Sequence, residues 1–111
     1  MQKTVAVVFG VVLLILGVWG FIQAPILSLF GVNTLQNIVH LVGGVLGIWL
    51  GMNGGKGFNL WTGWIALVLG ILGFIPGVSG ILAGLLGINT AISVLHVVVG
   101  VVLLVVAYKA D

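Results

Sequence analysis

Four long apolar runs constrain the fold of this chain more than any other feature of its sequence. Each run is close to the ~20 residues that cross a ~30 Å hydrocarbon core as an α-helix. The runs are Thr4–Ile22, Thr34–Met52, Gly57–Ile75 and Thr90–Tyr108. Charged residues make up only 4% of the chain, whereas a soluble domain carries about a quarter. We therefore predict an all-α integral membrane protein with four transmembrane helices.

The second half of the chain repeats the first half. An offset of 53 residues aligns the first run with the third, and an offset of 56 residues aligns the second with the fourth. The alignment pairs Lys3 with Lys56 and His40 with His96, and chance matches among Gly, Val and Leu would not also align such rare residues. Each repeat is then a helical hairpin, and the two hairpins have the same orientation in the membrane. We predict one membrane domain, residues 1–111, with hairpins over residues 3–52 and 56–108.

The lysines indicate the orientation of these hairpins. Two hairpins place both termini and the central linker on the same side of the membrane. Lys3, Lys56 and Lys109 all fall on that side, and the positive-inside rule assigns it to the cytoplasm. We expect a multi-pass protein of the bacterial cell membrane, with the lipid bilayer as its partner. The connections on the other side, residues 23–33 and 76–89, are apolar and are predicted to form short helices or turns in the interface.

Glycines inside the apolar runs predict how the helices pack. The chain has 19 glycines, and helix association in lipid depends on the close approach that small residues permit. The glycines predicted to pack helices are Gly10, Gly17, Gly20, Gly43, Gly44, Gly47, Gly51, Gly63, Gly70, Gly73 and Gly100. We favour packing within one chain, but small residues also serve homo-oligomers, so a homo-oligomer stays open.

A polar stripe begins each second helix of the two hairpins. It comprises Asn33, Asn37 and His40 in the first copy, and Asn89, Ser93 and His96 in the second. The two leading asparagines precede an apolar run and are predicted N-caps, since the first amides of a helix have no intrahelical partner. The histidines lie about 9 Å further along the helix, at 1.5 Å per residue. We expect them to point into the bundle.

Three interpretations of the histidines compete. In the first and favoured one, each histidine hydrogen-bonds Asn37, Ser93 or the other repeat and serves the fold. In the second, Asn37, His40, Ser93 and His96 form a ligand, ion or proton site near the outer face. In the third, the two imidazoles bind a metal ion or haem. The chain has no Cys and no Arg to supply further metal ligands or to meet haem propionates, so we predict no metal and no cofactor.

The sequence argues against several functional classes. Nucleic-acid binding needs a clustered basic face, and this chain has three lysines and no arginine. General acid–base catalysis needs paired titratable groups, but the only carboxylate side chain is Asp111. No phosphate-binding glycine loop occurs. We predict a non-enzymatic structural or interaction protein of the membrane. The alternative is a small ligand-binding, ion-binding or permeation unit.

The motifs resemble a known family. The stretch "GVWGFIQAP…LFGVNTLQNIVHLVGGVLG" resembles the N-terminal half of small bacterial four-helix membrane proteins catalogued as a domain of unknown function. Its matching positions are Gly17, Gly20, Phe21, Asn33, Leu35, Asn37, His40, Leu41 and Gly44. A weaker second copy keeps Gly70, Gly73, Phe74, Pro76, Asn89 and His96. Two extra residues precede Pro25, and Gln36 stands where the family often has a histidine. The resemblance implies a fold and a membrane location but no activity.

Overall fold

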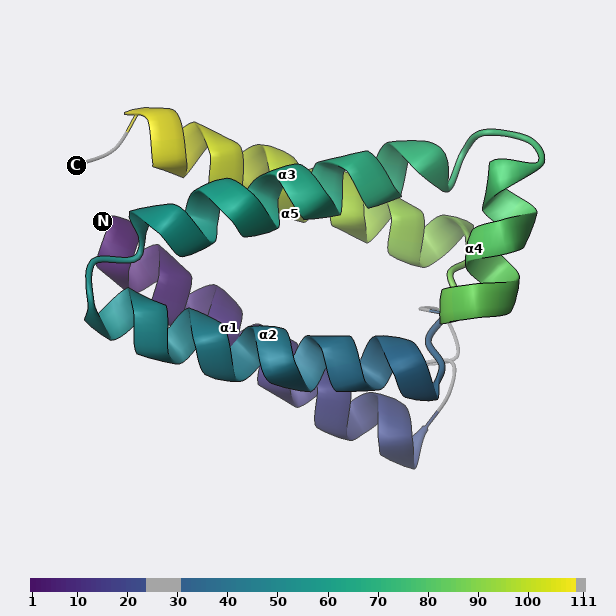
Figure 1. The fold of residues 1–111 in the computed structure, drawn as a ribbon, viewed down its shortest axis with the longest axis horizontal. Coiled ribbons are helices and arrows are strands. Elements are labelled where there is room, and N and C mark those ends of the chain that lie inside the picture. Colours follow the sequence, from purple (N-terminus) through teal and green to yellow (C-terminus); the bar gives the residue numbers. More distant parts are fainter. Residues whose placement is uncertain (24–30, 110–111) are drawn as a thin grey trace.

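The computed structural model describes residues 1–23 and 31–109 and is all-helical over these ranges (Figure 1). Its helices are α1 (Gln2–Ile22), α2 (Thr34–Met52), α3 (Lys56–Leu72), α4 (Val78–Leu86) and α5 (Thr90–Lys109). Three of them, α1, α2 and α5, are long and apolar enough to cross a membrane, with 21, 19 and 20 residues. The all-α prediction is confirmed for the described residues, and the apolar helices agree with a membrane protein.

The third predicted helix ends earlier than expected. We predicted it to continue to Ile75, but α3 ends at Leu72 and has 17 residues. Pro76 disfavours the helical conformation in the residue before it, and Gly77 adopts a left-handed φ of 88°. The chain turns there and starts α4, which lies where a short interfacial helix or turn was predicted. The equivalent prediction for the first connection falls on residues 24–30, outside the described ranges.

The long helices pack in two pairs, α1 with α2 and α3 with α5 (Figure 1). Contacts between the two pairs are far fewer than contacts within them. The N-terminus, the α2–α3 connection and the C-terminal end of α5 lie together at one end of the molecule, and α4 lies at the other end (Figure 1). The described fold is therefore two tight helical hairpins that touch each other only sparingly.

Glycines let the helices within each hairpin approach closely. A Cβ added to Gly44 of α2 would lie 2.7 Å from the carbonyl oxygen of Gly10 in α1. A Cβ added to Gly100 of α5 would lie 2.8 Å from the carbonyl oxygen of Gly63 in α3. These two contacts occupy equivalent positions at the offsets of 53 and 56 residues. Such a Cβ would come within 3.0 Å of a facing atom at Gly10, Gly17, Gly20, Gly47, Gly51, Gly63, Gly70 and Gly73 as well.

Gly43 differs from the other glycines that we predicted to pack helices. A Cβ there would meet only a side-chain atom of Leu13, at an ordinary 3.4 Å. Successive helical residues are rotated by about 100°, so Gly43 and Gly44 cannot both face α1. The close contact with α1 runs through Gly44, Gly47 and Gly51, and Gly43 faces the space between the two hairpins.

Candidate functional site

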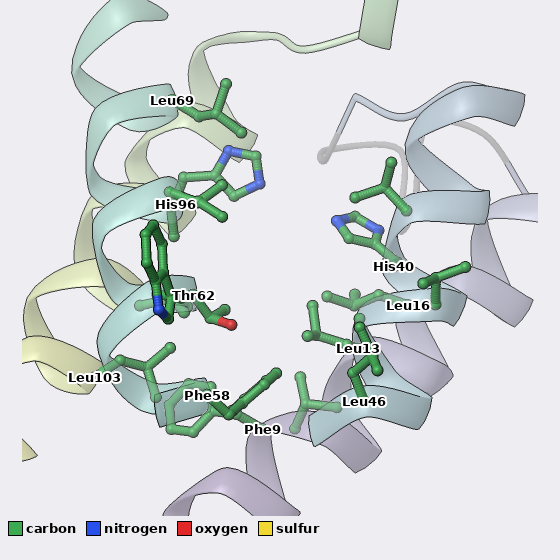
Figure 2. A pocket seen from close by; sticks show the side chains of 18 of the residues that line it. Phe9, Leu13, Leu16, His40, Leu46, Phe58, Thr62, Leu69, His96 and Leu103 are labelled. Atoms are coloured by element: carbon green, nitrogen blue, oxygen red, sulfur yellow. The ribbon is translucent and has the colours of Figure 1, made fainter. Parts of the chain in front are cut away.

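A large cavity separates the two hairpins (Figure 2). Its volume is about 1040 Å³, and α1, α2, α3 and α5 all contribute to its walls. Most lining side chains are apolar, and none of them is charged. The polar side chains among the lining residues are Gln36, His40, Asn53, Thr62 and His96. The cavity is thus an uncharged, apolar space with a few polar groups.

The cavity is open mainly on the side of α2 and α3. Seven of its lining side chains are between 41% and 72% exposed. Six of them lie on these two helices and one lies on α1: Ile38, Val39, Val42 and Leu46 on α2, Trp61 and Ile65 on α3, and Val12 on α1. These side chains therefore contact both the cavity and the surroundings of the protein. In a membrane, those surroundings at the middle of the helices would be lipid tails.

Hydrogen bonds tie the two hairpins together at the end that carries α4. Gln36 Nε2 donates to the carbonyl oxygen of Leu86 at 2.7 Å, and Asn33 Nδ2 donates to that of Leu85 at 2.9 Å. In return, Asn89 Oδ1 accepts from the backbone N–H of Gly31 at 2.9 Å. We call Asn33, Gln36 and Asn89 the α4 latch, because their side chains tie the start of α2 to the α4–α5 segment.

A second set of hydrogen bonds ties the hairpins at the opposite end. Gln2 Nε2 donates to the carbonyl oxygen of Val106 at 2.7 Å, and Asn59 Nδ2 donates to Gln2 Oε1 at 2.9 Å. Asn59 is completely buried. We call Gln2 and Asn59 the terminal latch. The exposed lining side chains on α2 and α3 lie between these two latches.

The latch residues Gln2, Gln36 and Asn59 were not predicted from the sequence. The predicted polar residues recur in both halves of the chain, and these three do not. At the two offsets, Gln36 aligns with Ile92 and Asn59 aligns with Ala6. An uncharged polar residue inside an otherwise apolar run was the available signal, because buried polar groups require partners.

His40 and His96 face each other across the cavity (Figure 2). They belong to different hairpins, and their ring centroids lie 6.5 Å apart in an edge-on arrangement, with an angle of 69° between the planes. His40 is only 6% exposed. The Nδ1 atoms of both rings are buried and have no hydrogen-bond partner among the described residues. The pair therefore offers unused hydrogen-bonding capacity to the cavity.

The other two residues of the predicted polar site lie elsewhere. Ser93 Oγ donates to the carbonyl oxygen of Asn89 at 2.9 Å and lies against Gly73. Asn37 Oδ1 lies against Gly20, in the equivalent place of the other hairpin. Neither residue lines the cavity, and neither receives a hydrogen bond from His40 Nδ1 or His96 Nδ1. The structure brings the two histidines together and places Asn37 and Ser93 between packed helices.

Asn33 and Asn89 both lie at the start of a helix. Asn33 Oδ1 accepts from the backbone N–H of Gln36 at 2.9 Å, and Asn89 Oδ1 accepts from that of Ile92 at 3.0 Å. Both bonds are those of an N-cap, three residues along the helix. The same side chains also belong to the α4 latch, so each asparagine begins a helix and ties the two hairpins together.

Replacing Asn89 by Ala tests this double role. The Asn89→Ala variant loses the cap of α5 and leaves the N–H of Gly31 unpaired, so we expect its free energy of unfolding to fall by about 2 kcal/mol. Asn53→Ala is the control: Asn53 is exposed and its side chain donates to the carbonyl oxygen of Trp49, one turn earlier, so we expect a change within about 0.5 kcal/mol. Unfolding by dodecyl sulfate, followed by circular dichroism, measures both. Equal losses would contradict the assignment.

The histidine pair would supply only two protein ligands to a metal ion. Within residues 1–23 and 31–109, no three side chains of His, Cys, Asp or Glu lie together in a group that could hold a metal. A structural zinc site has four ligands and a catalytic one has three protein ligands. The geometry thus favours hydrogen bonding over metal binding as the use of this pair.

Comparison with known proteins identifies a family for this chain. The family model described as "Domain of unknown function (DUF4383)" matches residues 3–109, which is nearly the whole chain. No curated protein and no solved structure matches the chain. The match confirms the predicted resemblance to a domain of unknown function. Its description names no activity, so the functional argument rests on the cavity.

Proposed function

Because the chain belongs to the DUF4383 family, whose description names no activity, we propose from its cavity that it is a non-enzymatic binding protein of the membrane. Its ligand is an uncharged, largely apolar molecule that enters from the lipid. The observation that carries this proposal is the uncharged cavity of about 1040 Å³ between the hairpins, open mainly on the side of α2 and α3.

The size and composition of the cavity support a ligand site. Ligand pockets usually measure about 300–1,000 Å³ and are lined mainly by apolar side chains with a few placed polar groups. The interiors of proteins are otherwise close-packed, with few voids larger than a water molecule. Within each hairpin the helices are close-packed at their glycines. A hollow of this size between two such hairpins is therefore a site for an occupant.

The hydrogen bonds at both ends of the bundle favour binding over permeation. An ion or polar solute that crosses the membrane needs an aqueous path to both ends of the bundle. Here the α4 latch and the terminal latch tie the hairpins at the two ends. The opening on the side of α2 and α3 instead faces the lipid tails, so the ligand is drawn from the bilayer.

We further propose that α3 crosses the membrane as a fourth span. At 1.5 Å per residue its 17 residues extend about 25 Å, and spans as short as about 17 residues occur. The equivalent contacts of Gly44 and Gly100 support two tandem hairpin repeats in parallel orientation. The three lysines then place both termini and the α2–α3 connection in the cytoplasm of a bacterial cell.

Photolabelling tests whether apolar molecules occupy the cavity. The protein is reconstituted into phosphatidylcholine nanodiscs with phenyl-trifluoromethyl-diazirine, an uncharged probe that reacts with nearby C–H bonds on illumination, and the adducts are located by peptide mass spectrometry. We expect adducts on Leu13 and Val99, which line the cavity, as well as on Val45 and Val105, which are exposed on outer faces.

A matched pair of variants separates the cavity from the outer surface. Gly43→Leu adds a side chain to the cavity wall, and Val45→Leu alters an exposed position outside the cavity. We expect Gly43→Leu to reduce the adducts on Leu13, because its Cβ would lie 3.4 Å from the Leu13 side chain and the added atoms would cover that part of the cavity wall. Val45→Leu should leave them unchanged. Adducts confined to the outer faces in the unmodified protein would overturn the proposed function.

A further inference from the structure

We infer, building on the proposed function, that the ligand is an uncharged amphiphile with a hydroxyl-bearing head and a single apolar tail. Its head lies among Gln36, His40 and His96, and its tail runs along the cavity toward Phe58. The inference adds the chemical class of the ligand and its direction in the cavity to the proposal of a binding site.

Unpaired polar atoms mark the position of the head. Gln36 Oε1, His40 Nδ1 and His96 Nδ1 are buried, and none has a hydrogen-bond partner among the described residues. All three side chains line the cavity. Gln36 and His40 lie one turn apart on α2, and His96 faces His40 from α5 (Figure 2). Buried polar atoms are nearly always paired in proteins, so a ligand that pairs with these atoms fits this end of the cavity.

The charge of the walls selects an uncharged head. None of the lining residues carries a charge, and the chain has no arginine to form a bidentate pair with a phosphate or carboxylate. A buried charge without a partner is strongly unfavourable. A phospholipid or fatty-acid head at the histidine pair would be such a charge, whereas an alcohol would not.

The chemistry of the three atoms selects a hydroxyl. The Gln36 oxygen only accepts hydrogen bonds, so its partner must be a donor. A neutral imidazole has one donor and one acceptor nitrogen, and a hydroxyl both donates and accepts. A ketone or ester head only accepts and would leave the Gln36 oxygen unpaired. A head with one or more hydroxyl groups can satisfy the glutamine and the histidines together.

The remaining walls fit one apolar tail. Away from the histidines, the cavity is lined by Leu13, Leu46, Phe58 and Leu103 (Figure 2). From Gln36 to Leu50, its lining residues extend along α2 for about 21 Å at 1.5 Å per residue. The volume of about 1040 Å³ is at the upper end of the range for a single bound ligand. The cavity therefore has the elongated shape and apolar walls of a site for one chain.

Three photoreactive probes that differ only in the head test the inference. Each carries a diazirine at the same carbon of a hexadecyl tail, and the heads are an alcohol, a carboxylate and a phosphocholine. They are compared at equal concentration in phosphatidylcholine nanodiscs. We expect adducts of the alcohol on Leu13 and Val99 to exceed those of either charged probe about tenfold, a difference of one decade in affinity. Equal labelling by the three heads would overturn the inference.

Histidine variants test the position of the head. We expect His40→Leu/His96→Leu to lower the alcohol adducts about tenfold and to leave labelling by phenyl-trifluoromethyl-diazirine unchanged. His40→Gln/His96→Gln keeps hydrogen-bonding groups and should retain most of the alcohol labelling. Unchanged alcohol labelling in the Leu variant would overturn the inference. Loss of labelling by both the alcohol probe and phenyl-trifluoromethyl-diazirine in the Leu variant would also overturn it, because that result would show that the histidines stabilise the fold. If the unmodified protein is not labelled by phenyl-trifluoromethyl-diazirine in the cavity, the proposed function itself fails.

Discussion

A single cysteine at Gly57 is expected to react with a membrane-impermeant maleimide only from the cytoplasmic side, and one at Gly80 only from the opposite side. The chain has no cysteine of its own, so each variant carries one thiol. An added Cβ at either glycine meets no atom within 4 Å, so neither substitution disturbs packing. Gly57 lies in the first turn of α3 and Gly80 lies in α4, beyond the other end of α3, and the positive-inside rule places the lysine-bearing end in the cytoplasm.

Maleimide labelling of each cysteine is expected to be all-or-none, because an impermeant reagent reaches only the outer face of sealed vesicles. Inverted and right-side-out vesicles expose opposite sides of the membrane. A cysteine at Val68, an exposed position inside α3, is the control and should react only after detergent is added. Reaction of the Gly57 and Gly80 cysteines from the same side would show that α3 does not cross the membrane. Reaction of each from the side opposite to that expected would leave α3 as a span but reverse the orientation of the protein.

The boundaries of the helices could be predicted where the sequence carries local signals. The range of α2, Thr34–Met52, was predicted to the residue, because Asn33 caps its start and Gly54, with a φ of 121°, follows its end. The end of α3 was predicted three residues too late, because the apolar pattern continues through Ile75 and hides the turn that Pro76 imposes. Capping and turn residues thus predicted the ends of the helices better than hydropathy did.

The arrangement of the hairpins could not be predicted in the same way. The sequence repeat predicts the packing within each hairpin, and the contacts of Gly44 and Gly100 occur at equivalent positions of the two hairpins. Three of the residues that tie the hairpins to each other, Gln2, Gln36 and Asn59, have no counterpart in the repeat. Because these residues act across long sequence separations, no periodicity indicates which backbone groups they meet. The cavity lies between these tied ends, and the sequence did not indicate it.

The candidate site was predicted in part for a similar reason. The matching positions of His40 and His96 in the two halves of the sequence predicted that they could meet, and in the structure their rings lie 6.5 Å apart. The polar stripe suggested that Asn37 and Ser93 would join them. A helical stripe is wide enough to face two neighbours, however, and the facing glycines Gly20 and Gly73 accept those two side chains instead. The spacing of polar residues along a helix does not show which of them face the cavity and which face the neighbouring helix.

Gly44→Leu is expected to lower the free energy of unfolding by about 3 kcal/mol, the upper part of the usual cost of overpacking. A Cβ at this position would lie 2.7 Å from the carbonyl oxygen of Gly10 and 2.7 Å from the backbone nitrogen of Leu14. Both are backbone atoms of α1, so they cannot move aside as a flexible side chain can. The helices of the first hairpin must separate, which costs packing along their whole length. Unfolding in dodecyl sulfate, followed by circular dichroism, measures the loss.

Gly43→Leu is the matched control, one residue away on the same helix. Its Cβ would meet only the side chain of Leu13, at 3.4 Å, so we expect a change within about 0.5 kcal/mol. Gly100→Leu provides the second measurement, because its Cβ would lie 2.5 Å from the backbone nitrogen of Leu67. Since Gly44 and Gly100 lie in different hairpins, the losses of the two variants should add in the double variant. Equal losses from Gly43→Leu and Gly44→Leu would contradict the assignment of the close contact to Gly44, and a neutral Gly100→Leu would show that the two hairpins are not packed alike.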